Sequence, residues 1–272
     1  MQKVLELTNK YIVLATPLII YSLISSIYLI ISAGGGRIIN YLFAIVLFLL
    51  MTSAFAAGWF NMIKIAVLNP EKEDANSLIK EFTSGVGEYF LPSIGAILLI
   101  LFLSIITIIF SYKLGMHYIG NINISAETLS DAMKNTTALK AFMLSLSEDQ
   151  LIKINLWNIL ILTSLSFTCF LSLLYLPALF FKNKNPFIAF YISLKDLFSK
   201  KIFKTFGIFL LIFTINFCIS ILSAILGNQM IMHFILTLIN FYFITAVGVG
   251  VFYYYYQNFV KNYIGQNVDI EI

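Results

Sequence analysis

The stretch TFGIFLLIFTINFCISILSAIL, from Thr205 to Leu226, carries no charge and is long enough to cross a membrane. An α-helix rises about 1.5 Å per residue, so about 20 apolar residues span the roughly 30 Å hydrocarbon core of a bilayer. The uncharged reach continues to Val260 and is interrupted only by His233. Because the polar sequence Gly227-Asn228-Gln229 predicts a turn, we divide this reach into two spans, 206–226 and 230–252.

Four further uncharged stretches precede this reach, and the composition agrees with a membrane as solvent. Of 272 residues, 60% are hydrophobic and 11% are charged, against roughly 25% charged in ordinary soluble domains. The predicted fold is all-α: a polytopic membrane helical bundle of about six transmembrane helices, forming one integral membrane domain over residues 1–272. The other four predicted spans are 11–33, 38–63, 89–112 and 154–181.

Lysine and arginine fall mainly on one side of these spans. Twelve lie at the termini and in the loops that share their side, and five lie on the other side, out of 17 in the chain. The positive-inside rule therefore predicts cytoplasmic termini and an external loop over residues 114–153. The excess of Ile, Phe, Lys and Asn is typical of an AT-rich bacterial genome, so we expect a multi-pass protein of the bacterial plasma membrane.

An internal repeat appears when the chain is shifted by 116 residues. Asn69-Pro70 then falls on Asn185-Pro186, and Phe82 falls on Phe198. Apolar residues at helical spacing follow each Asn-Pro pair, which predicts two cytoplasmic amphipathic helices. Both copies enter from the same side, so the prediction is two halves related by an axis along the membrane normal. The proposed anchors of this repeat are Pro70, Phe82, Pro186 and Phe198, with both phenylalanines buried.

Four lysines of the second copy are candidate contacts for lipid head groups. Each lysine close to an anionic membrane surface is worth about 1 kcal/mol. The alternative is that these lysines only set the orientation of the chain. The candidates are Lys195, Lys200, Lys201 and Lys204.

Two other patterns concern the packing and the ends of the spans. Ala54, Ala57 and Gly58 form a small-residue patch that favours close packing of two helices. The run Tyr253 to Tyr256 follows the sixth predicted span, where amphipathic rings prefer the membrane–water interface.

The chain resembles a known group of membrane proteins in two patterns. One stands at the start of a span and reads Gly85-x-Gly87-x-Tyr89-Phe90-x-Pro92. The other precedes the second copy of the repeat and reads Leu176-Pro177-Ala178-Leu179-Phe180-Phe181. These are six-helix bacterial and archaeal membrane families of unknown function, similar to the membrane domain of some glycerophosphodiester phosphodiesterases. The resemblance implies a fold and supplies no catalytic residue. The chain carries no soluble phosphodiesterase domain.

Residues that carry chemistry are sparse. No span has Asp, Glu, Lys or Arg near its centre, which counts against an ion pump or a proton-coupled carrier. His117 and His233 have no carboxylate or cysteine at a metal-ligand spacing, and Cys169 and Cys218 fit small buried apolar residues. Serine-hydrolase, zinc-protease and P-loop motifs are missing. We therefore expect no catalytic, cofactor or metal site and no enzymatic activity.

Two functions fit this pattern. The first is a non-catalytic scaffold, assembly or lipid-organising factor. The alternative is a transporter or a component of a lipid-handling permease, suggested by the repeat and by prolines at the ends of spans. Membrane lipids are the expected partners and nucleic acid is not, because the lysines form no dense basic stripe. The sequence leaves protein partners and homo-oligomers open.

Overall fold

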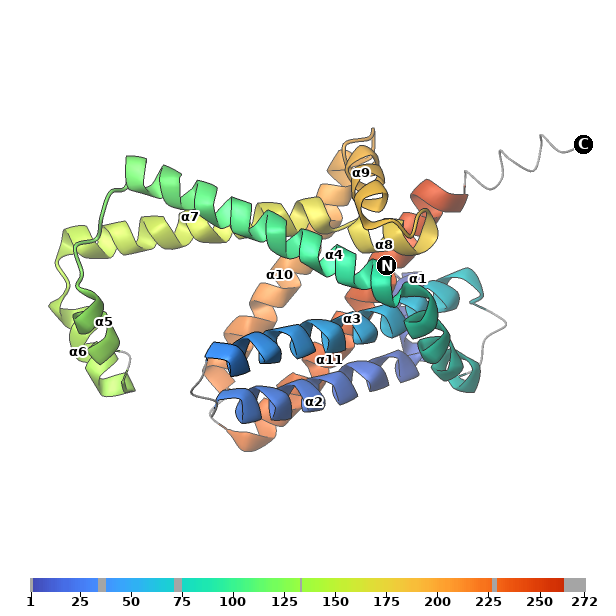
Figure 1. Ribbon diagram of the computed structural model, residues 1–272, viewed down its shortest axis with the longest axis horizontal. Helices are drawn as coiled ribbons and strands as arrows, with labels where there is room; N and C mark the ends of the chain where they lie inside the picture. The colour runs from blue at the N-terminus through green and yellow to red at the C-terminus, as the bar shows by residue number, and fades with distance from the viewer. Residues whose placement is uncertain (1, 34–37, 71–74, 133, 227–228, 262–272) are drawn as a thin grey trace, which may run out of the picture. The chain divides into compact units, whose positions relative to one another are not determined.

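The computed structural model describes residues 2–33, 38–70, 75–132, 134–226 and 229–261. Every regular element in these ranges is helical (Figure 1), which confirms the all-α prediction. The α-helices are α1 (Gln2–Lys10), α2 (Ala15–Ala33), α3 (Ile38–Leu68), α4 (Ala75–Tyr118), α5 (Ala126–Ala132), α6 (Thr136–Ser145), α7 (Glu148–Ser172), α8 (Tyr175–Phe181), α9 (Pro186–Leu197), α10 (Ile202–Leu226) and α11 (Met230–Tyr255). A 3₁₀ turn, η1 (Ile12–Leu14), follows α1, and a π-helix, η2 (Tyr256–Val260), follows α11.

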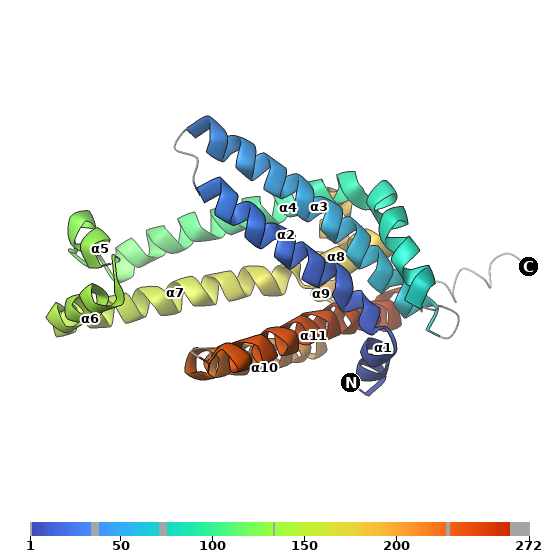
Figure 2. The same ribbon diagram turned by 90° about the horizontal axis from the view of Figure 1, so that it is seen from below.

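Six helical stretches among the described residues are long and apolar enough to cross a membrane, as predicted. Residues 227 and 228 of the predicted turn between the last two spans lie outside the described ranges. One span is much longer than expected, because α4 joins the first predicted amphipathic segment and the third predicted span in one helix. Figures 1 and 2 show a bend in this helix. Pro92 lies inside α4, and a proline within a helix removes one backbone donor.

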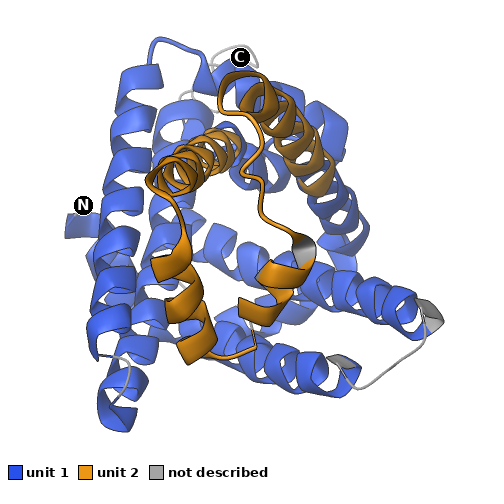
Figure 3. Cartoon of the chain, turned by 90° about the vertical axis from the view of Figure 1, so that its left-hand side faces the viewer, with its two compact units in different colours: residues 1–100, 171–272 blue, residues 101–170 orange. Residues whose placement is uncertain are grey.

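The chain divides into two compact units, residues 1–100 with 171–272 and residues 101–170 (Figure 3). The second unit contains the end of α4, α5, α6 and most of α7. Its two long helices are joined by a hydrogen bond of 2.9 Å between the hydroxyls of Thr107 and Thr168. The Trp157 indole donates to the Gly120 carbonyl at 3.2 Å. The predicted external loop over residues 114–153 is largely helical, because it contains the end of α4, α5, α6 and the start of α7.

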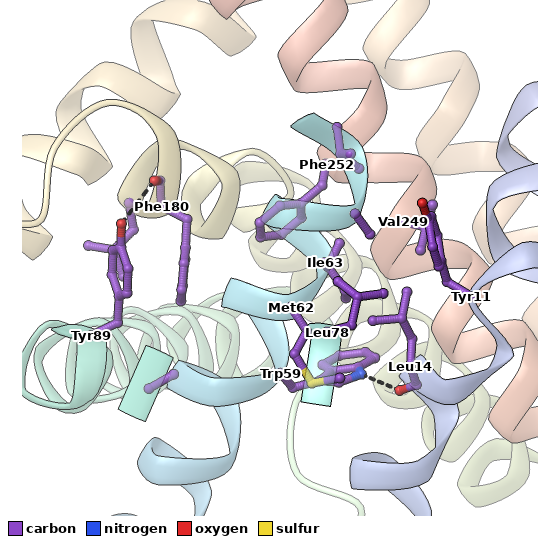
Figure 4. Close-up of a cluster of buried hydrophobic side chains, with 14 of the residues drawn as sticks. Tyr11, Leu14, Trp59, Met62, Ile63, Leu78, Tyr89, Phe180, Val249 and Phe252 are labelled. Carbon is purple, nitrogen blue, oxygen red and sulfur yellow. Dashed lines mark hydrogen bonds between the residues drawn. The ribbon is translucent and has the colours of Figure 1, made fainter. Parts of the chain in front are cut away.

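The core of the first unit forms where α3, η1, α8 and the last turns of α11 meet. The Trp59 indole donates to the Leu14 carbonyl at 2.8 Å, which fixes η1 against α3 (Figure 4). The Tyr89 hydroxyl donates to the Phe180 carbonyl at 3.4 Å, and the two rings stack at 4.3 Å between centroids. The Trp59 indole and the Tyr89 hydroxyl inside this apolar cluster thus have partners, whereas the buried Tyr175 hydroxyl has none among the described residues.

Burial in the first unit is uneven along each helix. Leu14 is 0% exposed just before α2 begins, whereas Ile30 near its other end is 76% exposed. Helix α3 behaves alike, with Met62 at 0% and Phe43 at 65%. Apolar side chains can remain exposed in this way when lipid surrounds the helix. Protein packing is therefore concentrated at the lysine-rich end, which we define as the end where α1, α8, α9 and η2 lie.

The predicted small-residue patch of α3 is confirmed as a packing site. A Cβ placed on Gly85 of α4 would lie 2.7 Å from the Ala57 carbonyl oxygen and 3.1 Å from the Gly58 Cα. The Phe82 ring covers Gly58 from the same side. Glycine at both positions lets the two helices approach closely.

The two repeat segments differ in the structure. The first runs without a break into its span, whereas α9 ends at Leu197 and α10 begins at Ile202. Phe82 is partly buried against the core, but Phe198 is 60% exposed, so the prediction of two buried phenylalanines is wrong. The reason is that α9 buries Ser193 and Leu197, which turns Phe198 outward. These segments give no support to two equivalent halves.

We expect Gly85→Ala to destabilise the protein by about 1 to 3 kcal/mol, because the added methyl group overlaps the α3 backbone. Gly87→Ala is the matched control, since nothing lies within 4 Å of its Cβ position. Alanine there should be neutral or stabilise the helix by up to about 1 kcal/mol. Thermal unfolding of the purified protein in detergent measures both. Equal stability of the two variants would contradict the close approach of α3 and α4.

Candidate functional site: the exposed face of α9

Helix α9 begins at a fixed point because its first turn is capped and packed. The Asn185 side chain accepts hydrogen bonds from the backbone N–H groups of Phe187 at 3.0 Å and Ile188 at 3.3 Å. Pro186 follows at the first helical position, where its fixed φ suits a helix start. A Cβ on Gly95 of α4 would lie 2.6 Å from the Pro186 ring. The predicted anchor Pro186 therefore lies in close contact with α4.

One face of α9 is buried in the protein. Ala189, Ser193 and Leu197 are each 0% exposed and lie four residues apart, on one side of a helix. Beside them, the Phe190 ring meets the Tyr175 ring of α8 edge to face at 5.3 Å. Helix α9 consequently lies against α8, as Figure 1 also shows.

An ion pair fixes the end of α9. The Asp196 carboxylate accepts from the Lys182 ammonium at 2.8 Å and from the Tyr255 hydroxyl at 2.6 Å. The Asp196 and Lys182 side chains are only 15% and 22% exposed. Lys182 also lies over the Tyr255 ring, 5.3 Å from its centroid. Through this one carboxylate, α9 is joined to the end of α8 and to α11.

The opposite side of α9 and the start of α10 expose aromatic rings among lysines. The four rings are 60 to 86% exposed, which is far more than a packed core allows. We call this set the α9 face; it consists of Phe187, Tyr191, Phe198, Phe203, Lys195, Lys200 and Lys204. Exposed rings with neighbouring lysines are typical of a segment that lies in a membrane interface.

The four predicted lipid-contact lysines do not share one environment. Lys195, Lys200 and Lys204 are exposed. Lys201 instead points into the protein, where its ammonium donates to the Asn258 carbonyl at 2.7 Å and lies 5.2 Å from the Phe259 centroid. The structure therefore places Lys201 as a tie between α10 and η2.

The first proposed anchor, Pro70, lies at the end of α3, outside the α9 face. Its carbonyl accepts from the Tyr11 hydroxyl at 2.8 Å and from the Lys10 ammonium. These two bonds satisfy a carbonyl that the end of α3 leaves without a helical partner.

The tyrosine run at the end of α11 does not form an aromatic belt. Tyr254 and Tyr255 are 7% and 0% exposed, so the prediction of four interfacial rings is wrong for these two. The Tyr254 hydroxyl shares a hydrogen bond of 2.8 Å with Thr205 in α10. Successive helical residues point about 100° apart, so four consecutive rings cannot share one face. Four consecutive tyrosines in the sequence therefore already indicate that some of the rings must point into the protein.

The carboxylates of the amphipathic segments are paired with neighbouring groups. Glu88 forms an ion pair with Lys184 at 2.9 Å, and Lys184 lies 5.4 Å from the Tyr89 centroid. The Tyr89 hydroxyl also accepts from the Lys64 ammonium at 2.7 Å. Glu81 accepts from the Asn61 amide at 3.3 Å. These contacts join α3, α4 and the segment before α9.

No group of three or more His, Cys, Asp or Glu side chains placed to hold a metal occurs in the described part of the chain. Cys169 and Cys218 are exposed, which contradicts the expectation that both are buried. Cys169 lies in α7 and Cys218 in α10. Neither cysteine belongs to the α9 face.

Comparison with protein-family models, curated proteins and solved structures found no match to this chain. The resemblance to the membrane domain of glycerophosphodiester phosphodiesterases stays a prediction.

Leu197, the last residue of α9, and Phe198, its C-cap, test which side of the helix is packed. Leu197→Ala should destabilise the protein by about 2 to 5 kcal/mol, because a fully buried side chain is removed. Phe198→Ala should cost much less, since that ring is 60% exposed. Thermal unfolding in detergent compares the two variants. A larger loss for Phe198→Ala would mean that the helix presents the other face to the protein.

Proposed function

We propose that this protein is a non-catalytic membrane protein that organises anionic lipids at its cytoplasmic surface through the α9 face. The observation that carries the proposal is the exposure of four aromatic rings, on α9 and at the start of α10, together with three exposed lysines. These are Lys195, Lys200 and Lys204, which form no ion pair among the described residues. The rings suit the boundary between hydrocarbon and head groups, and the ammonium groups suit the phosphates.

The rigid attachment of α9 favours lipid binding. The Asn185 cap fixes the first turn, and the Asp196 bonds fix the last. A preorganised surface loses little conformational entropy when a ligand binds. Each exposed lysine near an anionic leaflet contributes about 1 kcal/mol, so a group of them acts as a substantial attraction.

Many hydroxyls of the spans are bonded within their own helices, which favours lipid organisation over transport. Buried hydroxyls such as Ser53, Ser111 and Thr245 donate to carbonyls of their own helices, at 2.7 Å, 2.7 Å and 2.8 Å. A hydroxyl bonded in this way is already satisfied and offers less to a polar solute. A permease would instead need polar side chains that converge on a substrate.

The orientation belongs to the same proposal. Twelve of the 17 Lys and Arg residues fall on the side of the termini, which favours that side as cytoplasmic. The α9 face would then meet the leaflet that carries anionic lipid.

Anionic lipid should stabilise the full chain in detergent more than zwitterionic lipid does. We expect phosphatidylglycerol to raise the unfolding temperature above the value reached with phosphatidylcholine. In the double variant Lys195→Gln, Lys200→Gln, the apparent affinity for phosphatidylglycerol should fall by about tenfold or more. Both lysines are exposed, and no ion pair holds either one in the described structure.

The matched control removes two exposed lysines of the second unit, in the variant Lys113→Gln, Lys140→Gln. That control should keep the affinity of the wild type for phosphatidylglycerol. Equal stabilisation of the wild type by both lipids would refute the proposed function. An equal loss of phosphatidylglycerol affinity in both double variants would show a general charge effect and would refute a specific role of the α9 face.

Cysteine labelling tests the orientation in intact cells. In a background with Cys169→Ser and Cys218→Ser, we expect Ser130→Cys to react with an impermeant thiol reagent. Glu73→Cys, at a position outside the described residues, and Lys200→Cys should stay unlabelled until the cells are opened. Residues 130 and 200 are exposed, so access depends on the side of the membrane. Labelling of residue 200 from outside would reverse the proposed topology.

A further inference from the structure

A cleft of about 400 Å³ lies at the lysine-rich end, between α1, the end of α3 and the last turns of α11 with η2. Figures 1 and 2 show α1 beside the end of α11. We propose that this cleft binds a negatively charged phosphate group, either in a lipid head group or in a soluble phosphate compound. The site lies apart from the α9 face and deepens the proposed function, on which its lipid form rests.

The charge of the cleft favours an anion. Lys3 and Lys10 of α1 and Lys261 after η2 line it, together with one carboxylate, Glu6. Among the described residues, no carboxylate forms an ion pair with any of the three lysines. The four groups therefore sum to a formal charge of +2. Residues 71–74 lie outside the described ranges and form no part of the proposed site.

Helix α1 is held in place as a wall of the cleft. The Tyr11 hydroxyl and the Lys10 ammonium both donate to the Pro70 carbonyl, which ties the end of α1 to the end of α3. The Tyr242 hydroxyl of α11 donates to the Asn9 side chain at 2.6 Å. The lysines of α1 thus stand on a fixed element.

The π-helix arranges the other wall. Tyr253, Tyr256 and Gln257 line the cleft with Lys261, so one side of α11 continues through η2 to a lysine. Turns with π geometry occur often at functional sites. Tyrosine hydroxyls and the glutamine amide can donate to phosphate oxygens, and the lysines supply the charge.

The apolar base and the volume of the cleft indicate which class of ligand fits it. Leu7 and Val67 are 7% and 3% exposed and give the cleft an apolar base. Its volume falls in the range of sites for small molecules, about 300 to 1,000 Å³. The C-terminal ends of α3 and α11 contribute partial negative charge, so the attraction for phosphate must come from the lysines.

Calorimetric titration of the full chain in detergent tests the site. The probes are dioctanoyl phosphatidic acid, dioctanoyl phosphatidylcholine and inorganic phosphate. We expect phosphatidic acid to bind more tightly than phosphatidylcholine. The variant Lys3→Gln, Lys261→Gln should weaken phosphatidic acid binding by about tenfold or more. The variant Lys113→Gln, Lys140→Gln removes the same charge from the second unit and should leave this binding within about twofold.

The titration with inorganic phosphate distinguishes a lipid head group from a soluble phosphate compound as the ligand. Competition by inorganic phosphate would support a site that takes soluble phosphate compounds as well. Binding of phosphatidic acid without such competition would support a lipid head group. Absence of binding by both phosphatidic acid and phosphate would overturn the cleft proposal.

The variant Lys195→Gln, Lys200→Gln keeps this proposal distinct from the proposed function, because its affinity for phosphatidylglycerol tests the α9 face by itself. An equal loss of phosphatidic acid binding in Lys3→Gln, Lys261→Gln and in Lys113→Gln, Lys140→Gln would overturn the cleft and leave the test of the α9 face unaffected. Unchanged binding in Lys3→Gln, Lys261→Gln would overturn the cleft as well.

A second variant blocks the cleft without changing its charge. Leu68→Trp places a larger side chain in the lining and should weaken phosphatidic acid binding by about tenfold or more, while phosphatidylglycerol still stabilises the protein through the α9 face. A monodisperse elution profile and an unchanged unfolding temperature without lipid show that the variant is folded. Full binding by a folded Leu68→Trp protein would contradict the site.

Discussion

The Asp196 carboxylate accepts hydrogen bonds from Lys182 and Tyr255, and the position of α9 depends on those two contacts. A mostly buried charge is costly unless its partners are well placed, so each of the three groups requires the other two. Because the end of α9 is fixed, its outer side can expose rings and lysines in a defined arrangement. The proposed lipid contact is therefore a consequence of a bond on the opposite side of the same helix.

Tyrosine hydroxyls repeat this role at other points of the first unit. Tyr11 bonds to a carbonyl at the end of α3, Tyr242 to α1, and Tyr254 to α10. Lipid gives helices no hydrophobic reason to associate, so packing and hydrogen bonds must hold them together. A tyrosine supplies both, with an apolar ring and one polar atom. The 15 tyrosines in a chain with only 11% charged residues fit this need.

The features that followed from sequence are those set by length or by size. Uncharged runs gave the six apolar helices, and the small residues Ala57 and Gly58 marked the close contact with α4. The environment of Phe198 was not accessible in this way. Ser193 and Leu197 form one side of α9 and Leu194 and Phe198 the next, and both sides look apolar. Only the partners of α9, above all Tyr175 and Lys182, decide which side is buried.

The π-helix from Tyr256 to Val260 has a consequence for how this chain should be aligned with others. A π turn behaves as if one residue had been inserted into an α-helix, and one residue corresponds to a rotation of about 100°. A relative that lacks the insertion would have the same side chains one position earlier. An alignment that forbids a single-residue gap there would assign Lys261 to the wrong side of the helix. It would then pair Lys261 with a residue of the relative that is not its structural equivalent.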